Sequence, residues 1–274
     1  MTLPSGVRLA YDTFGSEGDP AVLVHGSWVD RRMWALLAPI LAPSLRLLTF
    51  DRRNHGASRG PERLHPVRED ANDLAELLVA TDLYPAHVVA HSYGGCVALA
   101  LATERPELVR SLAIHEAPAV GLLEDDPASL PIARGLRTAV ERLRAEIRAG
   151  HVDEAARSFV DEFAADPTAW DRLAPPWKEA FRANAPRWLE EFSDPATDRP
   201  DRAALADFVS PVLLTEGGRS PEFLHRMSAA IAGTLRNTTI RRLPDVGHFP
   251  HLTHPQVYAA VLLRFLVERD VPAM

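Results

Sequence analysis

The sequence has a single cysteine, Cys96, and it lacks the long apolar and basic runs that mark several large classes of protein. One cysteine excludes an internal disulfide bond and fits a reducing compartment, so we expect Cys96 to be a small buried helix residue. The N-terminus does not have the basic start followed by an apolar run that is typical of a secretory signal, and no apolar run in the sequence is long enough to span a membrane. The sequence also lacks a long run of Lys or Arg, so nothing in it indicates a surface that binds nucleic acid or an anionic membrane. We therefore expect a soluble, cytoplasmic protein with no nucleic-acid and no membrane partner.

What the sequence does contain is sufficient for a large apolar core. Its 274 residues are 46% hydrophobic, which allows one large core or a core with a subsidiary domain. Charged residues make up 24% of the chain, and the frequent arginines are interleaved with Asp and Glu, as on a solvated surface. Histidine pairs at the spacing of a metal-binding helix, with a suitable acid, are absent, so we expect no metal site.

Short apolar runs alternate with stretches of helical spacing, such as residues 31–42, through the first 118 residues. Because each run is almost continuously apolar, the pattern is typical of an α/β protein with a mostly parallel, twisted sheet covered by helices on both faces. In such sheets function lies at the carboxyl ends of the strands, so we expect the residues that close the runs to face one crevice. These residues are His25, Asp51, Ser92 and Glu116.

The pattern changes at about Val120, and up to Ala206 the chain is helical, charged and punctuated by prolines, with no strand-like run. After Ala206, strand-like runs occur again, and they are followed by a last stretch with helical spacing. We therefore predict a core formed by residues 1–118 and 207–274, with a helical cap, residues 119–206, inserted between the two parts of its sheet.

Ser92 lies where a buried strand turns into a helix, in the stretch A-H-S-Y-G. A tight bend of this kind requires small neighbours, which here are Ala90 and Gly94, and it exposes the serine hydroxyl. The backbone N–H of Tyr93, at the start of the helix, is a good donor to developing negative charge. A serine nucleophile needs a base and a third group that orients the base. The alternative interpretation of Ser92 is a helix N-cap.

The base should be a histidine on a loop that follows a late strand. The stretch LPDVGHFPHLTHP supplies His248 directly after a strand and a glycine, before the final helix. His251 and His254 are nearby alternatives, although His254 precedes a proline and has the character of a helix-start residue. A structural loop histidine is the other interpretation of His248.

Four segments, VLVHGSW, LLTFDRRNHGAS, VVAHSYGG and LPDVGHFPHLTHP, occur in this order at fitting distances. As a set they resemble the α/β-hydrolase superfamily, in which a cap is inserted after the sixth strand. The resemblance implies that Ser92 is the nucleophile and His248 the general base. It also implies that the backbone N–H groups of Ser27 and Tyr93 form the oxyanion hole, and that no cofactor is needed.

The acid of the triad is where the chain departs from the commonest pattern of the superfamily. That pattern has an aspartate in a turn after the seventh strand, and the matching position here is Ser220. Some branches, including certain haloalkane dehalogenases, coelenterazine luciferases and zearalenone-type lactonases, place the acid at the end of the sixth strand. Here that position is Glu116, and of these branches the lactonases use a serine nucleophile. The resemblance therefore favours a Ser92–His248–Glu116 triad.

Other assignments of the carboxylates and histidines stay open. Glu116 could instead pair with an arginine, and Glu216 is the second candidate for the acid. Asp245 and Asp51 are expected to stabilise their own loops. The two histidines that flank the strand ends are expected to pack in the core or to line the pocket, and they are His91 and His115.

The predicted reaction is hydrolysis of a carboxylic ester or lactone with an apolar body, and the expected partner is that small molecule, with a homodimer left open. Trp28 follows the oxyanion residue, and three tryptophans lie in the cap, so we expect them to line an apolar pocket; the alternative for each is ordinary packing. The cap tryptophans are Trp170, Trp177 and Trp188. Alternatives on the same scaffold are a C–C bond hydrolase, a perhydrolase, a thioesterase and a non-catalytic small-ligand receptor.

Overall fold

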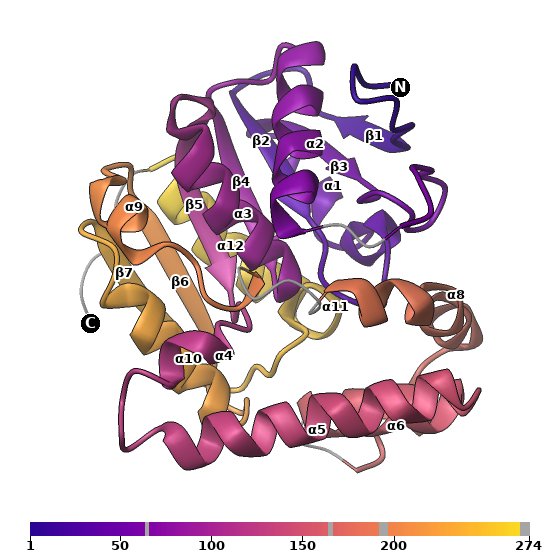
Figure 1. The fold of residues 1–274 in the computed structure, drawn as a ribbon. Helices are drawn as coiled ribbons and strands as arrows, with labels where there is room; N and C mark the ends of the chain where they lie inside the picture. The colour runs from indigo at the N-terminus through magenta and orange to yellow at the C-terminus, as the bar shows by residue number, and fades with distance from the viewer. Residues whose placement is uncertain (64–65, 164–166, 192–196, 269–274) are drawn as a thin grey trace.

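A seven-stranded, mostly parallel sheet forms the centre of the molecule (Figure 1). The computed structural model describes residues 1–63, 66–163, 167–191 and 197–268, so the end of the predicted core at 269–274 lies outside the described residues. The strands lie in the order β1-β3-β2-β4-β5-β6-β7, with β1 antiparallel to β3 and the other pairings parallel. Their bounds are β1 Tyr11–Phe14, β2 Asp19–Val24, β3 Leu45–Phe50, β4 Ala86–His91, β5 Val109–His115, β6 Val212–Gly217 and β7 Thr238–Leu243.

Residues of the central strands alternate between two apolar cores, one on each face of the sheet. Every residue of β4 is buried, and while Val88 and Ala90 belong to one core, Val89 belongs to the other. This alternation follows from the period of two residues along a strand and confirms the expected sheet with helices on both faces. Among the helices that contribute residues to these cores are α1 Ala38–Leu41, α2 Val67–Ala80, α3 Tyr93–Glu104, α9 Arg202–Asp207, α10 Glu222–Ala232 and α12 Pro255–Leu266.

The segment 31–42, predicted to be helical, forms two short pieces, the 3-10 helix η1 (Arg31–Trp34) and α1. Pro39 explains the interruption. It lies in the first turn of α1, where a backbone N–H has no partner within the helix, so proline is tolerated at that position. Inside one continuous helix, the proline ring would clash with the preceding turn. The apolar residues that gave the helical spacing, among them Met33 and Leu41, are nevertheless buried against the sheet.

Between β5 and β6 the described residues form helices and no strand. Figure 1 shows α5 and α6 on the side of the molecule toward which the parallel strands point. Among the described residues, no helix has both the length and the apolar character that crossing a bilayer would require. The helices of this interval are α4 Val120–Leu123, α5 Leu130–Arg148, α6 Val152–Phe163, α7 Ala169–Arg172 and α8 Pro175–Glu191, followed by α9.

Candidate active site

Ser92 occupies a strained turn between β4 and α3. Its φ of 52° is unusual for a residue other than glycine, and such conformations cost about 1–3 kcal/mol and persist where the surroundings impose them. A Cβ atom at Gly94 would lie 2.4 Å from the carbonyl oxygen of Val24, so the turn needs glycine for close packing. The Ser92 side chain makes no capping hydrogen bond to α3, which argues against the N-cap interpretation.

Glu116 stands beside Ser92, at the end of the neighbouring strand. His91 of β4 and His115 of β5 are register partners, so the residues that follow them, Ser92 and Glu116, lie at the same level of the sheet. Glu116 also has a positive φ, 51°, and is 1% exposed. Two strained residues at adjacent strand ends therefore turn toward the same region, which is the carboxyl edge of the sheet.

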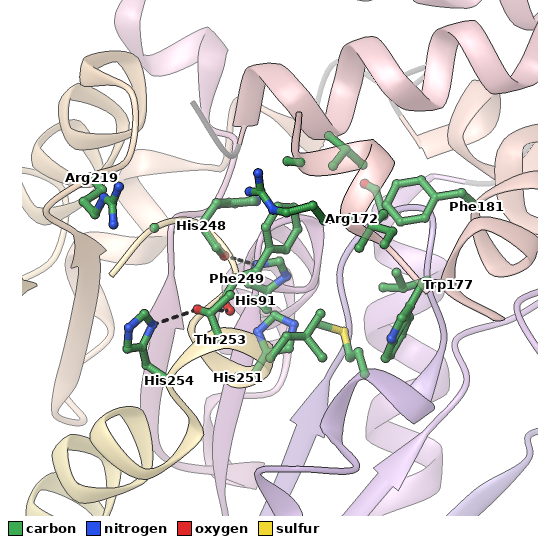
Figure 2. A pocket seen from close by; sticks show the side chains of 18 of the residues that line it. His91, Arg172, Trp177, Phe181, Arg219, His248, Phe249, His251, Thr253 and His254 are labelled. Atoms are coloured by element: carbon green, nitrogen blue, oxygen red, sulfur yellow. Dashed lines mark hydrogen bonds between the residues drawn. The ribbon is translucent and has the colours of Figure 1, made fainter. Parts of the chain in front are cut away.

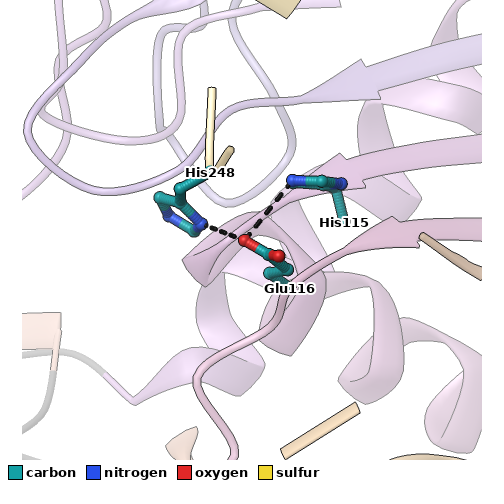
Figure 3. A group of neighbouring side chains, drawn as sticks. All are labelled: His115, Glu116 and His248. Atoms are coloured by element: carbon teal, nitrogen blue, oxygen red, sulfur yellow. Dashed lines mark hydrogen bonds and ion pairs between the residues drawn. The ribbon is translucent and has the colours of Figure 1, made fainter. Parts of the chain in front are cut away.

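The carboxylate of Glu116 is bonded to the imidazole of His248 (Figure 3). Glu116 Oε2 lies 2.7 Å from His248 Nδ1, and Glu116 Oε1 accepts a hydrogen bond of 2.8 Å from the backbone N–H of Gly217. With Nδ1 donating its proton to the carboxylate, the second ring nitrogen of His248, Nε2, carries the lone pair that a general base requires.

A second imidazole, that of His115, approaches the same carboxylate. His115 Nε2 lies 3.4 Å from Glu116 Oε2 (Figure 3). His115 Nδ1 lies 3.0 Å from the hydroxyl of Thr215. The sequence predicted only packing or pocket lining for this histidine. Side chains of consecutive strand residues point to opposite faces, but the strand ends at His115 and the positive φ of Glu116 breaks the alternation. The contact therefore depends on a backbone conformation that the sequence pattern does not reveal.

The environment determines the charge states of this pair. Burial raises the pKa of Glu116, but the neighbouring His115 and His248 imidazoles lower it by more, so that the pKa lies far below its usual value. Burial lowers the pKa of His248 below its usual value, and the hydrogen bond that His248 donates to Glu116 only partly opposes this effect. The result is an ionised acid next to a histidine that is neutral at neutral pH.

The other candidate acids have different partners. Glu216 accepts hydrogen bonds from the side chain of Arg242. Asp51 accepts hydrogen bonds from the backbone N–H groups of Arg31 and Ala57, as expected for a carboxylate that stabilises its own loop. The Ser220 hydroxyl, at the position of the usual aspartate, is buried and has no hydrogen-bond partner among the described residues.

Ser92 and His248 are both nearly buried, with 4% and 1% of their surfaces exposed. No hydrogen bond joins the Ser92 hydroxyl to the His248 ring among the contacts between described residues, and such bonds commonly tighten only when substrate binds. Tyr93 is the first residue of α3, where N–H groups point out of the helix end.

A cavity of about 600 Å³ begins beside His248 (Figure 2). Its wall includes Ser27 from the loop after β2 and His91 at the end of β4, and it extends to Trp177 and Phe181 of α8. The short helix α11 (Pro250–Thr253) forms another side of it. Most of its lining is apolar, which suits an apolar ligand body with its reacting group near His248.

Of the four tryptophans expected to line the pocket, Trp177 is on the wall of this cavity, whereas Trp28, Trp170 and Trp188 are not. These three are buried, and the ring of Trp28 lies 5.3 Å from that of Trp188 and 5.6 Å from that of Phe181. Trp188 borders a separate cavity of about 110 Å³. The pocket expectation is corrected for these three: they form an aromatic core between the loop after β2 and the helices that lie between β5 and β6 in the chain.

His115, Glu116 and His248 also form a group whose possible metal-ligand atoms all lie within 4.8 Å of one another. The 2.7 Å contact between Glu116 and His248 is a hydrogen-bond distance, which places the proton of His248 Nδ1 between these atoms. We therefore interpret the group as a carboxylate hydrogen-bonded to imidazoles.

Comparison with known proteins agrees with this geometry. A model of the alpha/beta hydrolase family matches residues 21–261 of the chain. The chain belongs to this family. The position of Ser92 on its turn and that of His248 on a late loop fit the resemblance seen in the sequence.

Similar proteins in this family carry out more than one reaction. The chain is 26% identical to a 2-hydroxymuconate semialdehyde hydrolase of a Pseudomonas species, over 99% of this chain and 95% of that protein. It is also 26% identical to a pimeloyl-[acyl-carrier protein] methyl ester esterase of Chromobacterium violaceum, over 95% of this chain and 98% of the relative.

Solved structures share the fold. An alpha/beta hydrolase of Sphaerobacter thermophilus superposes with a TM-score of 0.73 at 25% identity, covering 97% of this chain and 98% of that one. An N-acyl homoserine lactone degrading enzyme superposes with a TM-score of 0.77 at 23% identity, covering 95% of this chain and 97% of that one. At this identity the second likeness is one of fold.

Proposed function

We propose that the protein is a serine hydrolase that cleaves a carboxylic ester or lactone with an apolar body, through a Ser92–His248–Glu116 triad and an acyl-enzyme. The observation that carries the proposal is the 2.7 Å contact between Glu116 Oε2 and His248 Nδ1, at the strand end level with Ser92. Within this proposal, residues 119–206 act as a cap over a core formed by residues 1–118 and 207–274.

The reaction follows from the charge states of the site. His248 Nε2 takes the proton of the Ser92 hydroxyl as its oxygen attacks the substrate carbonyl. The backbone N–H groups of Ser27 and Tyr93 bind the oxygen that becomes negative, a contribution worth about 10²–10³ in rate for one donor. His248 then protonates the leaving alcohol, and the acyl group remains on Ser92.

Hydrolysis of the acyl-enzyme repeats the same steps with water. His248 takes a proton from water, the hydroxide adds to the acyl carbonyl, and Ser92 leaves with the proton as the carboxylic acid is released. Glu116 stabilises the imidazolium that forms in both halves of the reaction. Because its pKa is far below the usual value, it stays ionised throughout.

The substrate class is supported by the cavity and by one of the relatives. A cavity of about 600 Å³ whose lining is mostly apolar is large enough for a drug-sized or medium-chain ester. The pimeloyl methyl ester esterase of Chromobacterium violaceum supports an ester substrate. The resemblance to zearalenone-type lactonases, through the position of the acid, keeps a lactone within the proposal.

A second candidate is a C–C bond hydrolase. It is favoured by the 26% identity to the 2-hydroxymuconate semialdehyde hydrolase over nearly the whole length of both proteins. Perhydrolase, thioesterase and ligand-receptor functions remain alternatives on the same scaffold.

The test is a substrate panel of p-nitrophenyl esters, macrolactones and vinylogous diketones, together with fluorophosphonate labelling of the wild-type protein and a Ser92→Ala variant. We expect the wild-type protein to turn over an ester or a lactone. We also expect fluorophosphonate to label the wild-type protein but not the Ser92→Ala variant. Turnover confined to the diketones would favour the C–C bond hydrolase. Labelling without turnover of any substrate would favour a receptor that keeps its triad.

A further inference from the structure

One face of the cap helix α8 is directed at the loop that follows β2. Asn184, Trp188 and Glu191 are spaced four and three residues apart, so they share that face. Asn184 Nδ2 donates a hydrogen bond of 3.2 Å to the carbonyl oxygen of Trp28, and the ring of Trp188 packs against the ring of Trp28. The helix therefore holds the loop by both a polar and an aromatic contact.

The third residue of this face, Glu191, contacts the proposed oxyanion residue directly. The hydroxyl of Ser27 donates a hydrogen bond to Glu191 Oε2. Glu191 is the last residue of α8 and is 3% exposed. An acid at the carboxyl end of a helix opposes the helix dipole, so the stability of α8 itself does not account for a glutamate here.

The charge of Glu191 is balanced by a buried arginine. Arg52 is 1% exposed and forms an ion pair with Glu191 Oε1. The same guanidinium donates a hydrogen bond of 3.2 Å to the carbonyl oxygen of Gly26 and lies 4.4 Å from the centre of the Tyr93 ring. Arg52 thus contacts both segments that would supply the oxyanion donors, the residue before Ser27 and the ring of Tyr93.

The loop between these contacts is in an unusual conformation. Trp28 has a φ of 66° although it is not glycine, and it is completely buried. Such a backbone is kept only where surrounding contacts impose it. Those contacts come from α8, which belongs to the proposed cap, and from Arg52, which belongs to the proposed core.

We propose that Glu191 is a positioning residue, which fixes the backbone N–H of Ser27 in the oxyanion hole and so couples the seating of cap helix α8 to catalysis. This inference rests on the proposed function of the same site. Glu191 does not touch the reacting atoms: it acts through the Ser27 hydroxyl on one oxygen and through Arg52 on the other. An incorrectly seated cap would leave the oxyanion hole incomplete.

The test is a Glu191→Gln variant, assayed on the best p-nitrophenyl ester found for the wild-type protein. A small displacement of the Ser27 amide should lower kcat by about 10²-fold, with KM within about twofold of wild type. Affinity for an alkyl boronic acid, whose adduct with Ser92 places an oxygen in the oxyanion hole, should fall in proportion to kcat/KM. Affinity for the alcohol product p-nitrophenol, which would occupy the cavity without contacting the oxyanion hole, should be unchanged.

A matched control removes another ion pair between the same helix and the core. Arg187 of α8 is paired with Glu62 at 2.7 Å, and among the described residues no hydrogen bond joins either side chain to Ser27, so Glu62→Gln should leave kcat at the wild-type value. Ser27→Ala removes only the hydroxyl and leaves the Arg52–Glu191 pair in place. It should lower kcat by about tenfold, and the double variant Ser27→Ala/Glu191→Gln should be no slower than Glu191→Gln alone.

A Glu191→Gln variant with wild-type kcat, or one that loses alcohol binding and boronate binding equally, would overturn the proposal. If Glu191→Gln does not fold, Ser27→Ala decides, because a wild-type kcat in that variant contradicts the link through its hydroxyl. Failure of the proposed function has a different result, since the wild-type protein would then hydrolyse no ester or lactone of the panel.

Discussion

Two neighbouring strand ends, those of β5 and β6, offer the protein two places for the acid of its site. At the end of β5, Glu116 is bonded to His248, whereas after β6 the buried hydroxyl of Ser220 has no hydrogen-bond partner among the described residues. The β6 end still contributes, because the N–H of Gly217 donates to Glu116 Oε1. Adjacent strands are only about 4.8 Å apart, so a carboxylate on a longer side chain can replace one from the next strand without moving the histidine.

The largest loss of activity is expected when the acid at the end of β5 is replaced. Glu116→Gln should lower kcat/KM for an ester by about 10⁴-fold, because the amide favours the wrong tautomer of His248 and cannot stabilise its charged form. Ser220→Ala, the matched change on the β6 side, should stay within about twofold of wild type. Steady-state kinetics of the two variants checks this, and a fully active Glu116→Gln enzyme would mean that another group is the acid.

The next prediction moves the acid to the other strand end. The double variant Glu116→Gln/Ser220→Asp should recover at least about tenfold of the activity lost in Glu116→Gln, because position 220 is where the commonest members of the superfamily have their aspartate. The measurement is kcat/KM relative to both single variants. A double variant as slow as Glu116→Gln would show that the β6 turn of this chain no longer directs a carboxylate at His248.

Removing the second imidazole beside Glu116 should have a smaller effect. His115→Leu should lower kcat by about tenfold, roughly the contribution of one polar contact to a carboxylate. His115→Gln, which retains an N–H donor, should recover much of this loss. Equal rates in the wild-type and His115→Leu enzymes would show that the 3.4 Å contact has no role in catalysis.

The smallest effect concerns pH. Burial lowers the pKa of His248 below 6.5, so the acidic limb of the kcat/KM profile, where the base becomes protonated, should lie below pH 6.5. Glu116 raises the pKa of His248. In the Glu116→Gln variant, which lacks the carboxylate, the acidic limb of the kcat/KM profile should therefore lie at still lower pH. A limb that moves to higher pH in this variant would contradict the assigned pair.

Much of the fold could be predicted from the sequence, because continuous apolar runs and helical spacing are local signals. The positions of Ser92 and Glu116 at strand ends, and that of His248 on the loop after the last strand, followed from the same signals, together with the resemblance to the superfamily. The approach of His115 to Glu116 could not be predicted, since it depends on the positive φ of Glu116.

The helical interval between β5 and β6 was the less predictable region. Aromatic residues in amphipathic helices have the same spacing whether they line a pocket or fill an interior, which explains the wrong expectation for Trp170 and Trp188. The pair formed by Arg52 and Glu191 joins segments far apart in the chain, and it arises only once α8 is seated on the core.

The most direct test of the Glu116–His248 relay is the proton on His248 Nδ1, observed as a low-field NMR signal and assigned by its loss in a His248→Ala variant. We expect this signal in the wild-type protein and in Ser220→Ala, and we expect it to move strongly upfield or disappear in Glu116→Gln. A signal that is unchanged in Glu116→Gln but displaced in Ser220→Ala would contradict the account.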